Sequence, residues 1–215
     1  MNYDFNDTAR MVPAFATPIV VVNLKKELDL EEMKPIFEKW KTLNNRDNEH
    51  NDISIYARVL DDIQHTSLYK SIMNYVNFYF YEIMKVHDGV KPLITESWTN
   101  ITKPGEMHHV HNHANSVVSG VFYSQCDVAT GDIIFVKPYL DQLKFELTEF
   151  TPYNEEEKAY TPEPYDLLLF KSNIQHKVVE NKSKLDRVSM AFNTFFEGEA
   201  SPNYSTIRLN IRDCK

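Results

Sequence analysis

The fold class is decided by the stretch Ile94-Thr95-Glu96-Ser97-Trp98-Thr99-Asn100-Ile101, where the pattern of side chains changes to a period of two. This period is typical of β-strands, in which successive side chains point to opposite faces. Further strands are expected at 119–124, 132–136, 166–170, 177–180, 188–196 and 206–211. Turn residues separate them at 104–105, 130–131 and 162–164. This series of short strands predicts two antiparallel sheets packed as a jelly roll, the double-stranded β-helix.

The chain before residue 93 is expected to be largely helical and to support that jelly roll. Asp29 can cap a helix in which Pro35 would strain or delay the first turns. Its apolar residues are Leu30, Met33, Phe37 and Trp40. The clearest helix spans 66–86, where apolar residues recur at spacings of three and four and so share one face. These residues are Leu68, Ile72, Tyr75, Val76, Tyr79, Ile83 and Met84. We expect a mostly β protein with these N-terminal helices on one outer face of the jelly roll.

The remaining segments complete this layout. Residues 1–16 are expected to form a loosely held arm, 18–22 a short buried strand and 43–52 a polar loop. The region 140–161 is polar and rich in glutamate, which predicts a long insertion or lid. A length of 215 residues suits one domain spanning 1–215, with a helical support at 1–92 and a jelly-roll core at 93–215.

Composition limits the classes of function. The net charge of −8 argues against a general affinity for phosphate backbones, so nucleic acid is an unlikely partner. No apolar run approaches the roughly 18 residues of a membrane span, and residues 1–15 contain no apolar signal-peptide core. The two cysteines, Cys126 and Cys214, are too few for a disulfide framework, which favours a reducing, cytoplasmic location. The sequence leaves the oligomeric state open.

Four histidines lie together in Met107-His108-His109-Val110-His111-Asn112-His113. In a strand, alternate residues share a face, so His109, His111 and His113 would point together and His108 would point away. Converging neutral imidazoles suit a divalent first-row metal ion. A surface cluster of histidines without a metal explains the same residues equally well.

A downstream group favours the metal site. His176 follows a turn after the apolar strand 166–170, and Arg187 and Ser189 lie a few residues further on. In a strand these last two side chains share a face, where a guanidinium and a hydroxyl form a good receptor for a carboxylate. The alternative for Arg187 is a structural salt bridge, since the chain contains 31 acidic residues.

The order and spacing of these motifs resemble the 2-oxoglutarate and Fe(II)-dependent oxygenase superfamily. More narrowly, they resemble a family of bacterial and phage oxygenases with an H-x-H motif. The matching segments are His111-Asn112-His113-Ala114, Ser119-Gly120-Val121-Phe122-Tyr123, Gly131-Asp132-Ile133-Ile134-Phe135, Phe170-Lys171-Ser172-Asn173-Ile174-Gln175-His176 and Arg187-Val188-Ser189-Met190-Ala191-Phe192-Asn193. The resemblance covers about residues 96–196.

The resemblance implies an Fe(II)- and 2-oxoglutarate-dependent dioxygenase that uses O2 and hydroxylates a substrate which the sequence does not identify. It also implies site residues. His111, His113 and His176 would bind the iron, and Arg187, assisted by Ser189, would bind the distal carboxylate of 2-oxoglutarate. Further residues implied in the cosubstrate pocket are Tyr123, Trp98 and Asn100.

The chain departs from the superfamily pattern at His113, where most members have an aspartate. Imidazole in place of carboxylate removes one negative charge from the metal ligands, which should weaken the retention of Fe(II) and change its redox behaviour. A shifted assignment, with His109 and His111 as the pair, also satisfies the alternation. It ranks second because the spacing from His113 to Tyr123 better matches the superfamily.

Two other classes of function compete with this hypothesis. One is a cupin-like dioxygenase with three histidines and no 2-oxoglutarate, which would not need Arg187 and Ser189 in its pocket. The other is a non-catalytic jelly-roll module that serves a structural or binding role. Binding of 2-oxoglutarate would favour our hypothesis over the cupin-like enzyme. Failure to bind any divalent metal ion would favour the non-catalytic module.

Overall fold

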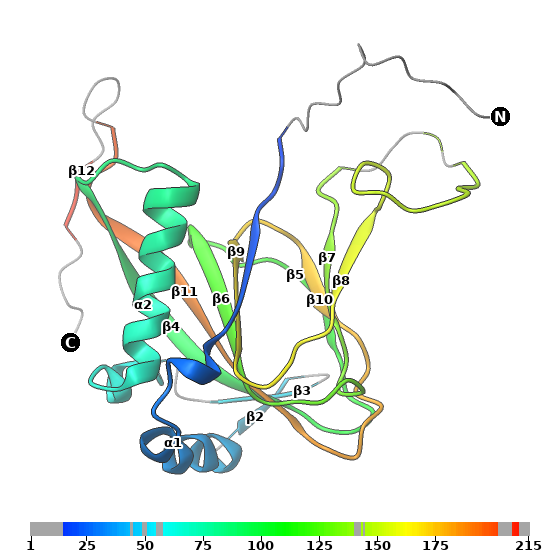
Figure 1. Cartoon of the computed structure of the whole chain (residues 1–215), viewed down its shortest axis with the longest axis horizontal. Helices are drawn as coiled ribbons and strands as arrows, with labels where there is room; N and C mark the ends of the chain where they lie inside the picture. The colour runs from blue at the N-terminus through cyan, green and yellow to red at the C-terminus, as the bar shows by residue number, and fades with distance from the viewer. Residues whose placement is uncertain are drawn as a thin grey trace.

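The computed structural model describes residues 15–43, 45–48, 51–54, 58–139, 143, 145–201 and 208–210. In these residues the strands form two antiparallel sheets (Figure 1). The larger has the order β1-β9-β6-β11-β4-β3-β2, with β12 paired to β11, and the smaller has the order β5-β10-β7-β8. The bounds in the larger sheet are β1 Ile19–Asn23, β2 Asn45–Asn48, β3 Asn51–Ser54, β4 Val90–Thr102, β6 Val118–Gln125, β9 Asp166–Lys171, β11 Arg187–Glu199 and β12 Arg208–Leu209; those in the smaller are β5 His108–His111, β7 Ile133–Val136, β8 Glu157–Tyr160 and β10 His176–Val178.

The larger sheet is covered on both faces, and strand β9 shows how the sequence achieves this. Its residues Leu167 and Leu169 belong to the core shared with the helices. Leu168 and Phe170 belong to a second core, which also contains Ile133 and Phe135 of the smaller sheet. Because alternate side chains point to opposite faces, a run of apolar residues fills both cores.

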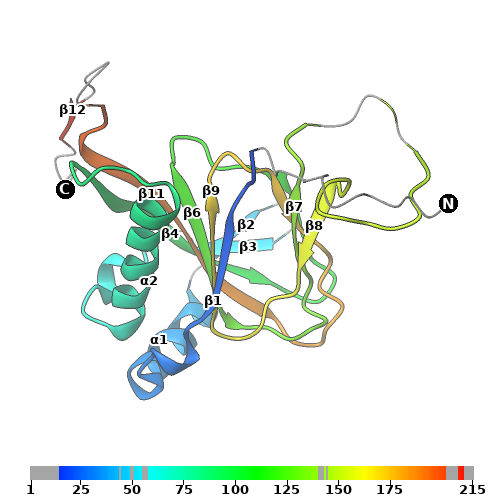
Figure 2. The ribbon, with the colours of Figure 1, turned by 45° about the horizontal axis from the view of Figure 1, so that its top comes forward.

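The helices cover the outer face of the larger sheet. Helix α1, Leu30–Thr42, begins at Asp29, whose carboxylate accepts hydrogen bonds from the backbone N–H groups of Glu31 and Glu32. Helix α2, Ser67–Phe78, continues as a π-helical turn at Tyr79–Ile83. Short 3₁₀ turns lie at Leu24–Lys26 and Asp61–Ile63. Figure 2 shows α1 and α2 on one side of the larger sheet and β7 and β8 on the other.

Most expectations for the fold are confirmed. The protein is mostly β, its helices lie on one outer face, and its two sheets form the expected jelly roll. The helix through Pro35 forms without interruption, and the apolar residues of 66–86 face the core. The single domain, with its support at 1–92 and core at 93–215, stays a prediction. Residues 1–14 of the expected arm lie outside the described residues. Among the described helices, none is long and apolar enough to cross a membrane.

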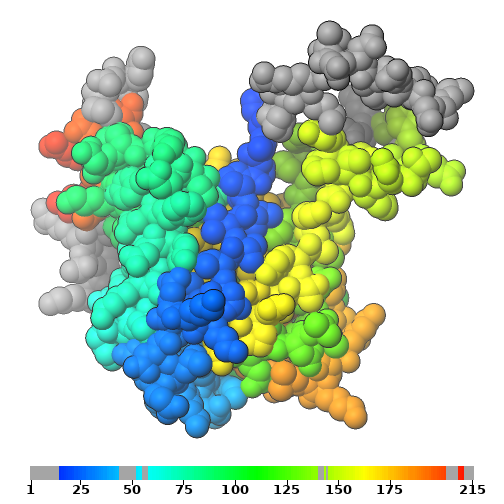
Figure 3. Space-filling model, viewed as in Figure 1, coloured from blue at the N-terminus to red at the C-terminus, as the bar shows by residue number. Residues whose placement is uncertain are grey.

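One expectation about loops is wrong, and a second is wrong only at its C-terminal end. The expected polar loop 43–52 contains strand β2 and the first two residues of β3; the two strands pair with each other and extend the sheet at β4. The expected insertion 140–161 ends in a strand, because residues 157–160 form β8. Its described part projects from the body of the molecule (Figure 3). Exposed apolar side chains there are Leu143, Phe145, Leu147, Phe150 and Tyr153.

Candidate metal centre

Three histidines converge at one end of the smaller sheet. His111 is the last residue of β5 and pairs directly with His176, the first residue of β10. Their ring centroids are 4.3 Å apart, and the ring of His113, two residues beyond β5, lies 5.2 Å from each. One ligand atom from each of the three lies within 4.8 Å of the other two. This spacing fits a single metal ion held by imidazole nitrogens about 2.0–2.1 Å away after small side-chain adjustments.

Backbone contacts hold His113 and His176 near each other. The N–H of His113 donates to the carbonyl of Ser172 (2.9 Å), and the N–H of Ser172 donates to the carbonyl of Val117 (3.1 Å). The Ser172 hydroxyl is in turn hydrogen-bonded to Ser119 of β6 (2.8 Å). The turn before β10 is thereby tied to the segment after β5, which fixes His113 although it lies outside a strand.

The ring nitrogens of two histidines are already oriented for a metal. Nδ1 of His111 lies 2.9 Å from the carbonyl oxygen of His109, and Nδ1 of His176 lies 3.1 Å from that of Ile174. A carbonyl oxygen only accepts hydrogen bonds, so each Nδ1 carries the proton and each Nε2 presents its lone pair. Backbone carbonyls fix metal-binding histidines in this way in many proteins.

Burial keeps these imidazoles neutral. It lowers the pKa of His176 to about 3, and the nearby His111 lowers it further. Burial also lowers the pKa of His113 to about 4, again with a contribution from His111, and it lowers the pKa of His111 itself. Neutral imidazole is the form that binds metal ions, so the site is ready for a cation at neutral pH.

The expectation that His108 points away is wrong. His108 lines the same cavity as the three histidines, and its ring centroid lies 4.2 Å from that of His111. The cause is an irregularity in the pairing of β5 with β10, since His111 pairs with His176 but His108 pairs with Val178. Four residues of β5 therefore lie opposite three of β10, and this bulge breaks the simple alternation.

Side chains from the larger sheet line the same cavity. They are Arg187 and Ser189 of β11, Tyr123 of β6, and Trp98 and Asn100 of β4. In β11, alternate side chains point to opposite faces of the sheet. Val188 and Met190 therefore pack in the core against the helices, and Arg187 and Ser189 face the cavity. The register adds to it, since Ser189 pairs with Asn100 on one side and with Tyr123 on the other. All the residues expected in the cosubstrate pocket are thus brought together with the histidines.

Arg187 is a buried cation without an anionic partner. Its side chain is 3% exposed, and its Nη2 donates to the hydroxyl of Thr102 (3.0 Å). Among the described residues, its Nε and Nη1 have no hydrogen-bond partner, and no carboxylate forms an ion pair with it. Leaving buried donors and a buried charge unpaired is costly, so the cavity favours an anionic ligand at this point. The alternative of a structural salt bridge therefore has no support among the described residues.

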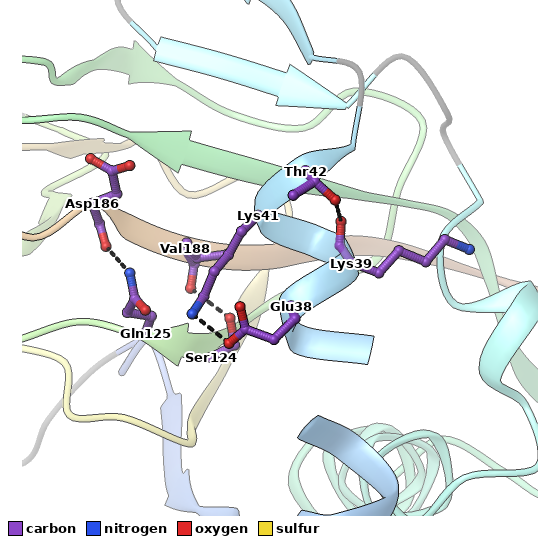
Figure 4. A network of polar contacts seen from close by, with 8 residues as sticks. All are labelled: Glu38, Lys39, Lys41, Thr42, Ser124, Gln125, Asp186 and Val188. Carbon is purple, nitrogen blue, oxygen red and sulfur yellow. Dashed lines mark hydrogen bonds and ion pairs between the residues drawn. The ribbon is translucent and has the colours of Figure 1, made fainter. Parts of the chain in front are cut away.

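Side chains of β6 hold the backbone on either side of Arg187. The Gln125 amide donates to the carbonyl of Asp186 (2.9 Å), and the Ser124 hydroxyl donates to the carbonyl of Val188 (3.2 Å). Figure 4 shows both contacts near the C-terminal end of α1. They position the start of β11 so that the guanidinium enters the cavity.

Sequence reasoning missed two residues of this site. His108 lies in the cavity because of the bulge in β5, which leaves no clear signal in the sequence. Thr102 meets Arg187 because the two residues are directly paired between β4 and β11. That register comes from pairing across 85 positions of the chain, and the side-chain pattern of either strand alone does not reveal it.

A comparison with protein-family models gives one match, to the family described as "Putative 2OG-Fe(II) oxygenase", over residues 96–193. The matched segment begins in β4 and ends in β11, so it contains all eight residues expected at the site. A search of the curated proteins gives no match.

Solved structures share the fold at low sequence identity. An oxidoreductase of the 2OG-Fe(II) oxygenase family from Burkholderia pseudomallei matches with a TM-score of 0.58 and 11% identity, over 82% of this chain and 83% of that one. HygX from Streptomyces hygroscopicus, with nickel and 2-oxoglutarate bound, matches with a TM-score of 0.55 and 11% identity, over 83% and 82%. A prolyl-4-hydroxylase from Pseudomonas putida matches with a TM-score of 0.51 and 14% identity, over 82% and 92%. These likenesses confirm the fold.

Proposed function

We propose that the cavity binds one Fe(II) and one 2-oxoglutarate and that the protein is a dioxygenase, because residues 96–193 match the model of the family described as "Putative 2OG-Fe(II) oxygenase". His111, His113 and His176 are the proposed metal ligands. Bound together, iron and 2-oxoglutarate would supply the oxidising chemistry that uses O2 to hydroxylate a C–H bond, with succinate and CO2 as by-products. The protein itself must bind, orient and shield these groups.

The donor set fits a divalent first-row ion. Three neutral imidazoles lie within one another's reach, and two of them have Nε2 free because Nδ1 is hydrogen-bonded to a carbonyl. His113 replaces the carboxylate that completes the usual site. An ion bound by these three residues therefore keeps its full charge of +2, which strengthens its attraction for an anionic cosubstrate.

Arg187 is proposed to bind the distal carboxylate of 2-oxoglutarate. Its Nε and Nη1 are donors without partners among the described residues, and a guanidinium N–H forms a strong, charge-assisted hydrogen bond with a carboxylate. Ser189 shares its face and is proposed to assist. The Tyr123 hydroxyl stays protonated because burial raises its pKa. Tyr123 can therefore donate a hydrogen bond, while Trp98 and Asn100 complete the proposed pocket.

The unpaired guanidinium is the observation that carries this proposal. A cupin-like three-histidine dioxygenase that does not use 2-oxoglutarate does not require a buried arginine beside its metal. A purely structural module would gain stability from replacing that arginine with an apolar residue, since a buried charge without a partner is unfavourable. A site for an acidic cosubstrate accounts for the arginine and the histidines together.

Production of succinate tests the proposal. The purified protein is incubated in air with Fe(II), ascorbate and 2-oxoglutarate, and succinate is measured by mass spectrometry. The variant His176→Ala removes a proposed ligand, and His65→Ala is its matched control because His65 is exposed and lies outside the cavity. We expect succinate from the natural protein and from His65→Ala, but not from His176→Ala. Equal rates in all three proteins, or no succinate from any, would contradict the proposal.

A further inference from the structure

A second group of three histidines lies beside the proposed iron site. His108, His109 and His111 also have one ligand atom each within 4.8 Å of the others. The ring of His108 stacks on that of His109 at 4.8 Å and lies 4.2 Å from that of His111. His108 and His111 are half-buried, whereas His109 is exposed. The group therefore reaches from the cavity to the protein surface.

The two groups share His111, and its chemistry prevents them from binding independently. Nδ1 of His111 is hydrogen-bonded to the carbonyl of His109, so only Nε2 offers a lone pair. Nδ1 of His108 lies 3.2 Å from the same carbonyl, which likewise leaves its Nε2 available. One lone pair on His111 binds one ion. An ion held by His108 and His109 together with His111 would therefore take His111 away from His113 and His176.

We propose that His108, His109 and His111 form an alternative binding site for Zn(II) or Cu(II), and that filling it inhibits the protein by withdrawing His111 from the iron site. The alternative site depends only on these three side chains. Its inhibitory effect also rests on the proposed function.

The ligand chemistry of this group suits these two ions, as it does at the proposed iron site, which also lacks a carboxylate. The group consists of imidazoles without a carboxylate, and imidazole sites bind Cu(II) and Zn(II) more tightly than Fe(II) in the ordinary order of divalent metals. Burial, assisted by the neighbouring His111, lowers the pKa of His108 to about 4, so this ligand is neutral at pH 7. Zinc–nitrogen bonds of about 2.0–2.1 Å require the three rings to move closer.

Zinc binding to the metal-free protein tests the alternative site without relying on activity. Affinity and stoichiometry are measured at pH 7 by competition with a chromophoric zinc chelator. His113→Ala disables the proposed iron site but keeps His108, His109 and His111. The double variant His109→Ala/His113→Ala disables both groups. Circular dichroism checks that each variant is folded, and His65→Ala controls for the loss of an exposed histidine.

We expect His113→Ala to bind one Zn(II) and the double variant to bind it at least about 100-fold more weakly, since even changes behind a metal ligand cost about 10–100-fold. The natural protein should bind one Zn(II) in the shared region. Equal zinc affinity in His113→Ala and the double variant would overturn the alternative site. Two ions bound in the natural protein at these histidines would overturn the sharing of His111.

The inhibitory effect is measured separately, by succinate production at rising Zn(II). His109→Ala should need a higher zinc concentration for half inhibition than the natural protein, by about tenfold or more. Equal inhibition of the two proteins would overturn the regulatory proposal. If neither protein produces succinate, the proposed function fails, and the regulatory proposal fails with it. The zinc-binding measurement on His113→Ala still decides whether the alternative site exists.

Discussion

Replacing Arg187 by methionine should stabilise the protein in the absence of ligands and abolish its binding of 2-oxoglutarate. Arg187 is 3% exposed, and among the described residues only its Nη2 has a hydrogen-bond partner, the hydroxyl of Thr102. Burial lowers the pKa of the guanidinium, as expected for a charge without a carboxylate beside it. Methionine has a similar length and no donors, so it removes the unpaired groups and still fills much of the space.

The expected gain follows from the two donors without partners. Each buried unsatisfied donor costs about 1–3 kcal/mol, so Nε and Nη1 together cost about 2–6 kcal/mol. The substitution also loses the hydrogen bond to Thr102 and leaves a buried hydroxyl, which offsets about 1–3 kcal/mol. We expect the free energy of unfolding to rise by about 1–3 kcal/mol. For a chain of this length, each kcal/mol raises Tm by about 2–4 °C.

The same substitution should greatly weaken the binding of 2-oxoglutarate. Truncation of a buried, charge-assisted contact typically costs about 2–5 kcal/mol, which weakens binding by a factor of about 30 to several thousand. Urea unfolding of the metal-free protein measures the stability. Calorimetric titration with 2-oxoglutarate, using Mn(II) to replace Fe(II), measures the affinity.

Arg58→Met is the matched control for this substitution. Arg58 is half-exposed and paired with Asp61 (2.6 Å), and it lies outside the cavity. Its loss should change neither the affinity for 2-oxoglutarate nor, beyond about 1 kcal/mol, the stability. The reasoning is refuted if Arg187→Met is less stable than the natural protein, or if it binds 2-oxoglutarate with natural affinity.

Three further predictions concern the same cavity. His113→Asp should keep the fold and bind Fe(II) at least as tightly as the natural protein, because it restores a carboxylate facing the metal; weaker Fe(II) binding in an equilibrium titration would count against His113 as a ligand. The metal-free protein should lose stability between pH 7 and pH 5. The unfolded chain binds protons at histidine near pH 6.5, whereas His176 and His113 resist protonation until about pH 3 and pH 4 in the folded state. Their contribution to the free energy of unfolding is therefore fully present above pH 6.5 and declines below it. In urea unfolding, the free energy of unfolding of His176→Gln should fall less steeply with decreasing pH. Metal and 2-oxoglutarate together, each at about 100 times its Kd, should raise the free energy of unfolding by about 2.7 kcal/mol per ligand; an unchanged Tm in a thermal melt would show that neither binds the folded cavity.

The sequence predicts those parts of the site that obey simple strand alternation. Arg187 and Ser189 share a face because they are two residues apart in β11, and Trp98 and Asn100 share one in β4 for the same reason. His176 could be placed because it follows a turn after an apolar strand. In these cases the local pattern and the final packing agree, so spacing predicts which side chains share a face, and the family resemblance assigns these faces to one cavity.

Other features depend on pairing between distant strands and escape such reasoning. The bulge that brings His108 into the cavity exists only when β5 pairs with β10. Strands β2 and β3 look like a polar loop because their backbone pairing, rather than an apolar face, makes them strands. The side-chain pattern does not predict strand β8 for the same reason. Its residues Glu157 and Lys158 are exposed, and the strand is defined by its pairing with β7.

Anaerobic titration of the metal-free protein with Fe(II) and 2-oxoglutarate tests the central claim most directly. Bidentate binding of 2-oxoglutarate to iron held by His111, His113 and His176 should give a visible charge-transfer band that saturates at one equivalent of each. The band should be absent in His176→Ala and, at concentrations that saturate the natural protein, in Arg187→Met. No band from the natural protein, or a band of equal strength in all three, would contradict the assignment of this cavity as the oxygenase site.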